Sequence, residues 1–222
     1  MYNKSVKNKL FIISFVLNII VFLLVLAGTI VMMTIGSGAL ATNSLSVFKY
    51  FTFQSNIYMG IVALVYAYYQ FLIIKKKKEK IPHVLAIFNR VGVTAVTLTF
   101  LVVIAFLAPG YGYDKMYNNA NLFFHLLVPV VAIINYVVFT KTEKCHFAHT
   151  IYPIIPCVLY GIVYLIVVVS LNAYGDLSID FYNFGKDGPL MGVVNFLIII
   201  SLSYIIGVVL YLSSLFVFKK RK

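Results

Sequence analysis

Thr52 and His125 each lie near the start of an apolar stretch, and their side chains are of types that could take part in proton transfer. A threonine hydroxyl becomes a nucleophile when a neighbouring base takes its proton, and a neutral imidazole is the side chain best suited to do so near neutral pH. The other three histidines, His83, His146 and His149, fall in connecting segments that carry lysine, whereas His125 lies near the start of an apolar stretch. His125 is therefore the candidate base for chemistry inside a membrane.

Further polar residues share a helix face with each member of this pair. Thr52, Ser55 and Asn56 stand at positions i, i+3 and i+4, and Asn121 precedes His125 by four residues. We treat Ser55, Asn56 and Asn121 as candidate substrate-binding or oxyanion-stabilising residues. The alternative is purely structural, because Ser, Thr and Asn in membrane helices often hydrogen-bond to a neighbouring helix for about 0.6–2 kcal/mol.

The composition of the chain indicates what must position these residues. The 222 residues are 62% hydrophobic and 11% charged, with a mean hydropathy of +0.99, whereas soluble domains are about half apolar and about a quarter charged. A membrane helix needs about 20 apolar residues. We therefore predict an all-α, polytopic membrane protein, a single six-transmembrane-helix bundle without a separate soluble domain. The expected spans are 10–35, 51–74, 85–108, 121–140, 150–174 and 189–218.

The distribution of basic residues predicts the orientation of the bundle. Of 18 Lys and Arg residues, 15 fall on the side that holds both termini, and only Lys49, Lys115 and Lys186 fall on the other. This asymmetry is typical of the positive-inside rule, so we expect both termini to be cytoplasmic. The net charge of +12 then reflects contact with anionic membrane lipids and not nucleic-acid binding. In this orientation Thr52 and His125 lie at similar depth, near the outer leaflet.

Two further motifs have simpler explanations. Ala39-Leu40-Ala41 has the form of a signal-peptide cleavage site, but the preceding apolar run is about twice as long as a signal core, so we expect a retained first helix. Cys145-His146-x-x-His149 resembles half of a metal site, but the short loop carries no second cysteine to complete it. We therefore expect no metal and no organic cofactor.

Three segments resemble a known family of small multispan proteins. Lys49-Tyr50-Phe51-Thr52-Phe53-Gln54-Ser55-Asn56 begins one span, His125-x-x-x-Pro129 follows two spans later, and an aromatic-Asn-Phe-Gly segment, 182–185, precedes the last span. Together they resemble the androgen-induced and androgen-dependent TFPI-regulating family. The Phe-Gln-Ser-Asn continuation and the absence of Trp look more like the prokaryotic relatives, which implies a prokaryotic plasma membrane.

The resemblance implies a function. The matched threonine and histidine of the animal members are regarded as the catalytic pair of a hydrolase that acts on fatty acid esters of hydroxy fatty acids, so Thr52 and His125 take these roles here. The expected partners are a lipid or fatty-acyl ester substrate and membrane lipids, without nucleic acid. Two alternatives stay open: a noncatalytic lipid-binding protein, and a small-solute transporter or channel whose polar faces line a pathway.

Overall fold

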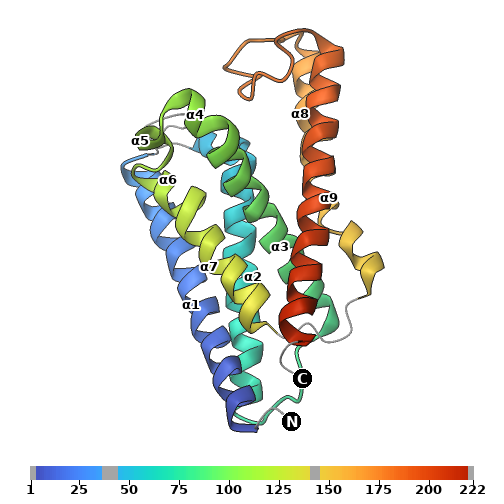
Figure 1. Cartoon of the computed structure of the whole chain (residues 1–222). Coiled ribbons are helices and arrows are strands. Elements are labelled where there is room, and N and C mark those ends of the chain that lie inside the picture. The colour runs from blue at the N-terminus through green and yellow to red at the C-terminus, as the bar shows by residue number, and fades with distance from the viewer. Residues whose placement is uncertain (1–3, 37–44, 141–145, 220–222) are drawn as a thin grey trace.

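The protein is a bundle of helices that alternate in direction (Figure 1). The structure, a computed structural model, describes residues 4–36, 45–140 and 146–219, so Ala39 to Ala41 and Cys145 lie outside the described residues. Within the described ranges, six helical segments are long and apolar enough to cross a membrane: Asn8–Thr34, Phe51–Ile74, His83–Tyr111, Ala120–Phe139, Phe147–Ser170 and Pro189–Val217. The expectation of an all-α chain with six such segments is confirmed.

These segments contain continuous helices and short irregular ones. The α-helices are α1 (Lys4–Thr34), α2 (Phe51–Ile74), α3 (His83–Val102), α4 (Ala108–Tyr111), α5 (Tyr113–Met116), α6 (Ala120–Leu122), α7 (Val128–Ile134), α8 (Ile154–Ser170) and α9 (Pro189–Lys219). Three π-helical turns are η2 (Val103–Leu107), η3 (Phe123–Leu127) and η4 (Asn135–Phe139), and two 3₁₀ turns are η1 (Leu45–Lys49) and η5 (Phe147–Ile151).

The two ends of the bundle carry different elements. We call the end where α1 begins and α9 finishes the terminal end, and the opposite end the distal end (Figure 1). The distal end carries the first turn of α2, residues 112–119 and the loop 171–188 that connects α8 to α9. The first turn of α2 and the start of the fourth span are thus at the same end, as the sequence predicted for Thr52 and His125.

Proline explains the π-helical turn that carries His125. Proline has no N–H, and its ring collides with the carbonyl group four residues earlier in a regular α-helix. For Pro129 that carbonyl belongs to His125. The N–H of Val128 reaches instead to the carbonyl of Phe123, five residues back, which widens this turn. The same arrangement precedes Pro109. The fourth span, Ala120–Phe139, lies close to the expected range 121–140 but is not one regular α-helix.

The fifth span also differs from the expected range 150–174. It consists of η5 and α8, with Pro153 between them, because a proline cannot continue a helix from the preceding turn. The helix ends at Ser170, since Asn172 adopts the left-handed conformation, with φ of 49°. The first helix begins earlier than expected, at Lys4, whereas α2 has the expected bounds.

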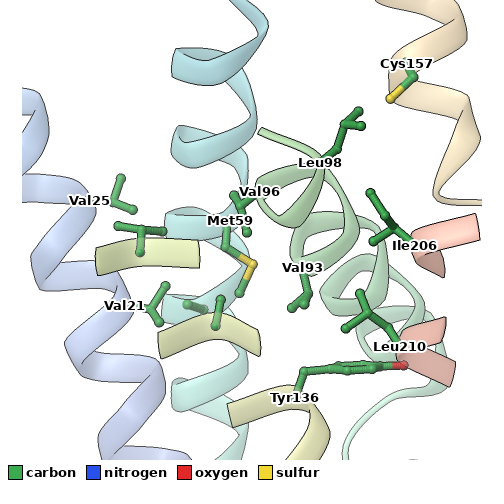
Figure 2. Packing of buried hydrophobic residues seen from close by; sticks show 13 residues of the cluster. Val21, Val25, Met59, Val93, Val96, Leu98, Tyr136, Cys157, Ile206 and Leu210 are labelled. Carbon is green, nitrogen blue, oxygen red and sulfur yellow. The ribbon is translucent and has the colours of Figure 1, made fainter. Parts of the chain in front are cut away.

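Close packing joins the helices around an apolar core, shown in Figure 2. Residues from α1, α2, α3, α7, η4, α8 and α9 contribute to one cluster, which includes Val21, Met59 and Val96. Helix α8 packs chiefly against α9, and the two form a pair that leans away from the other helices toward the distal end (Figure 1). A glycine permits this pairing, because a Cβ atom on Gly161 would lie 1.6 Å from the Phe196 ring.

A buried polar network joins α1, α2 and η4 in the half of the bundle nearer the terminal end. The Asn18 amide donates to Gln70 Oε1 over 2.8 Å and accepts from Asn135 Nδ2 over 2.9 Å, and Gln70 Nε2 donates to Ser14 over 3.1 Å. Because apolar side chains cannot satisfy these groups, the network fixes the relative register of the three segments. Asn135, which shares the sequence face of His125, therefore bonds to Asn18 and lies away from the candidate site.

Candidate functional site

The first turn of α2 is held by contacts on its backbone. Tyr50 is extended, and the Phe51 N–H that follows donates to the Tyr182 hydroxyl over 2.9 Å. The Thr52 carbonyl accepts hydrogen bonds from Ser55 Oγ over 3.0 Å and from Asn56 Nδ2 over 2.8 Å. The Thr52 side chain is partly exposed, and among the described residues no hydrogen bond engages its hydroxyl. The hydroxyl is thus free to turn toward a substrate or a base.

Asn56 links the first turn of α2 to the π-helical turn η3. Its side chain is fully buried, and the same Nδ2 that binds the Thr52 carbonyl also donates to the Phe124 carbonyl over 3.2 Å. The Phe53 and Phe124 rings pack nearly at right angles, with centroids 5.5 Å apart. Both N–H bonds of the amide are therefore used, and the neighbours of Thr52 and His125 are fixed against each other.

The His125 imidazole is oriented by the short helix α5. It is 7% exposed, and its Nδ1 lies 2.7 Å from the Met116 carbonyl oxygen. Because a carbonyl can only accept a hydrogen bond, Nδ1 carries the proton and Nε2 keeps its lone pair. Asn121 Nδ2 donates to the neighbouring Lys115 carbonyl over 3.2 Å. Both side chains thus satisfy carbonyl groups at the end of α5, which a short helix leaves unpaired.

The five candidate residues of the sequence are gathered at the distal end, but Thr52 and His125 are not joined directly. In the described ranges, no hydrogen bond connects the Thr52 hydroxyl with the imidazole. Ser55 lies one turn below, where its hydroxyl is 3.4 Å from the Thr99 hydroxyl of α3. A depression of about 370 Å³ over α5 is lined by Tyr113, Asp114, Tyr117 and Asn118, and neither member of the pair lines it.

The loop 171–188 covers the start of α2, a feature that sequence reasoning missed. Besides the contact of Tyr182 with the Phe51 N–H, the Tyr160 hydroxyl of α8 donates to the Lys49 carbonyl over 2.6 Å. The Lys49 ammonium group donates to the Ser178 carbonyl over 3.2 Å and lies 4.8 Å from the Phe181 ring centroid. The high density of aromatic residues around Tyr182 was the available signal. Two separate segments, α8 and the loop 171–188, therefore position the residues that precede Thr52.

A buried carboxyl group shapes this loop. Asp180 is 0% exposed and accepts hydrogen bonds from the N–H groups of Gly175, Phe184 and Gly185 over 2.9–3.0 Å, and from the Tyr164 hydroxyl. A Cβ atom on Gly185 would lie 3.1 Å from the Asp180 carboxyl oxygen. The aromatic-Asn-Phe-Gly segment thus has a local role: Tyr182 contacts α2, while Phe184 and Gly185 bind the carboxyl group.

We expect alkaline pH to weaken the contact between the loop and α2. Burial raises the pKa of Tyr182 to about 12, so its stabilising contribution is complete below pH 10, the value for an unfolded tyrosine, and is lost as the pH rises through 12. Solvent reaches the partly exposed Tyr182 side chain and reduces the effect of the pKa shift, so the expected loss of unfolding free energy is about 1–2 kcal/mol. Thermal unfolding of the purified protein and of Tyr182→Phe should be compared at pH 9, 10.5 and 11.5. The variant should lose less stability; identical pH profiles would contradict this role.

Neither a metal-binding cluster among the described residues nor a known relative points to a function. Among the described residues, no group of three or more His, Cys, Asp or Glu side chains is arranged to hold a metal ion. No protein-family model, no curated protein and no solved structure matches the sequence. The described part of the chain is therefore an all-helical protein with six helices long and apolar enough to cross a membrane. The geometry of the candidate site is the remaining basis for a function.

Proposed function

We propose that the chain is a multi-pass integral membrane protein of a prokaryotic plasma membrane, with both termini in the cytoplasm. The excess of basic residues near the terminal end supports this orientation. Large apolar side chains are exposed on the outer surfaces of the long helices, for example Leu23, Ile61, Leu159 and Leu197. Such surfaces are stable in contact with lipid tails. In this orientation the distal end and the candidate site belong to the outer leaflet.

We further propose that the protein hydrolyses fatty acid esters within the membrane, with Thr52 as the nucleophile and His125 as the general base. The single observation that carries this proposal is the hydrogen bond of His125 Nδ1 to the Met116 carbonyl. This hydrogen bond selects the tautomer whose Nε2 can accept a proton. The imidazole is buried, and it lies in the turn that Asn56 joins to the start of α2. The resemblance to the threonine hydrolase family provides independent support.

The reaction would proceed in two steps. As Thr52 Oγ attacks the ester carbonyl carbon, His125 Nε2 takes the hydroxyl proton and then gives it to the departing alcohol, which leaves an acyl-threonine. In the second step His125 takes a proton from water, the hydroxide attacks the acyl group, and the proton returns to Thr52. The proton transfer needs a distance of about 2.6–3.2 Å, which catalytic pairs often reach only when substrate is bound.

The developing oxyanion requires hydrogen-bond donors. Both N–H bonds of Asn56 are engaged by backbone carbonyls, and Asn121 binds the Lys115 carbonyl. We therefore assign positioning roles to these two amides. The N–H of Thr52, at the open start of α2, has no hydrogen-bond partner in the described part of the chain and is the donor that we favour.

A noncatalytic lipid-binding protein is the second candidate. An apolar groove of about 500 Å³ between α3, α7, η4 and α9 favours it, because this volume falls within the range of about 300–1,000 Å³ typical of small-molecule sites. The groove is not lined by Thr52 or His125. Lipid binding there and hydrolysis at the distal end can be measured separately.

Covalent labelling and turnover test the hydrolase proposal. We expect the purified protein to react with a fluorophosphonate probe and to hydrolyse long-chain esters of hydroxy fatty acids, whereas Thr52→Ala loses both properties. Thr52→Ser keeps the hydroxyl and should retain both. Thr29→Ala is the matched control and should retain both properties, because the hydroxyl that it removes bonds to the Val25 carbonyl within α1. Equal turnover by folded wild-type protein and Thr52→Ala would refute the hydrolase and favour the lipid-binding protein.

A further inference from the structure

An arginine is buried inside α3, two helical turns from its first residue. Arg90 is 1% exposed, although it stands in an otherwise uncharged helix. Its Nε donates to the Tyr136 hydroxyl over 2.9 Å, and its Cζ lies 5.2 Å from the centroid of the Tyr211 ring. By sequence, Arg90 is one of the 15 basic residues on the side that holds both termini. The structure places it between three segments, α3, η4 and α9.

The guanidinium group is incompletely satisfied by the protein. Both Nη1 and Nη2 are buried without a hydrogen-bond partner, and no ion pair involves Arg90 within the described residues. Burying an unpaired charge costs several kcal/mol, whereas a bidentate oxyanion satisfies two guanidinium nitrogens at once. The two free nitrogens therefore define a site that favours an oxyanion with two oxygens.

Two unpartnered hydroxyl groups lie on the segments that contact the guanidinium. Thr94 follows Arg90 by one turn of α3, and Thr140 comes directly after η4, four residues beyond Tyr136. The Oγ1 atoms of both threonines are buried without a hydrogen-bond partner. Buried polar groups are rarely left unsatisfied in native proteins. These two hydroxyl groups add unused hydrogen-bonding capacity on the segments that contact Arg90, as a polar ligand would require.

The apolar groove lies between the segments that surround Arg90, and Arg90 itself is not among the residues that line it. On α3 the groove is lined by Thr97 and Leu101, which follow Arg90 by about two and three turns. The other two walls contain Val137 and Leu210, the chain neighbours of the two tyrosines that contact the guanidinium. Figure 2 shows the Tyr136 ring beside Leu210, with Ile206 one turn before Leu210 in α9. The remaining lining residues are Ile133, Ile134, Val138, Leu202, Ile205, Val209 and Ser213.

We propose that this groove binds a long-chain carboxylic acid, with its hydrocarbon chain between α3, η4 and α9 and its carboxylate on Nη1 and Nη2 of Arg90. An apolar groove between the helices that surround a buried cation is complementary to an amphiphile with a single charged end. The full burial of Arg90 favours a carboxylate, because a phospholipid phosphate carries a bulky headgroup that would have to enter with it. The site lies far from Thr52 and does not depend on the proposed hydrolysis.

Binding of palmitate to the full-length protein in nanodiscs of uncharged phosphatidylcholine tests the proposal. We expect saturable binding that raises the unfolding temperature, and at least a tenfold weaker affinity for Arg90→Met. This variant should fold, because replacing a buried charge by an apolar side chain of similar volume is often neutral or stabilising. Lys77→Met removes an exposed basic residue near the same end of the bundle and should bind as the wild type does. Thr52→Ala should also bind normally, which separates this site from the hydrolase proposal.

Competitors identify the occupant. Hexadecanol, which has the same chain without the charge, should compete at least tenfold less well than palmitate. Stronger competition by phosphatidylglycerol than by palmitate would overturn the proposal in favour of a phospholipid headgroup. Equal palmitate affinity in the wild type and Arg90→Met would also overturn it.

Glu143→Gln tests for an internal partner of Arg90. Unchanged palmitate binding is expected. At least tenfold tighter binding would show that Glu143 normally pairs with the guanidinium group.

Discussion

His125→Ala is expected to reduce ester hydrolysis by roughly 10²–10⁴-fold, the usual contribution of a general base. Because Thr52 and His125 would act as one unit, the double variant with Thr52→Ala should be little worse than either single variant. If the two substitutions instead caused independent structural defects, their fold reductions in turnover would multiply in the double variant. Steady-state turnover of the four proteins, each checked for its unfolding temperature, measures this nonadditivity.

His125→Asn separates chemistry from structure in this experiment. The imidazole donates to the Met116 carbonyl over 2.7 Å and so helps to hold α5 in place. An asparagine amide can also donate a hydrogen bond to a backbone carbonyl, but it cannot accept the threonine proton at neutral pH. We expect the variant to be more stable than His125→Ala and equally inactive. Recovery of activity in His125→Asn would assign His125 to positioning alone.

Asp180→Asn is expected to destabilise the distal end by roughly 3 kcal/mol, because at least two charge-assisted hydrogen bonds of about 1.5 kcal/mol each are lost. The carboxyl group accepts from three backbone N–H groups and one hydroxyl, and an amide would turn N–H bonds of its own toward some of these donors. Thermal unfolding of the purified protein measures the effect.

Asp176→Asn is the matched control, since Asp176 lies in the same loop but is exposed, and its carboxyl group bonds only to Ser178 among the described residues. It should unfold as the wild type does. The Asp180 variant should also show faster exchange of the Phe51 amide hydrogen, because Tyr182 would no longer be held against α2. Equal unfolding temperatures for the two variants would show that the buried carboxyl group does not organise the loop.

The sequence by itself determined the class of fold and several element bounds. Six apolar stretches, separated by basic residues or by Gly, Pro and Asn, are sufficient to predict six helices, because each needs about 20 apolar residues to cross a bilayer. The range 51–74 was predicted without error, since Lys49 and the lysines from Lys75 onward bound it on both sides. Helical periodicity placed Thr52, Ser55 and Asn56 on one face, and the alternation of direction placed them at the same end as Asn121 and His125.

Only the tertiary structure decided what each polar side chain contacts. Asn135 shares a sequence face with His125, yet it bonds to Asn18, more than one hundred residues away. Arg90 falls at the cytoplasmic end of the expected span 85–108, and only the packing of η4 and α9 around α3 buries it. Local periodicity fixes the face on which a residue lies, whereas the groups that meet across helices depend on how the helices pack. For that reason the carboxyl group of Asp180 and the guanidinium group of Arg90 became visible only in the folded chain.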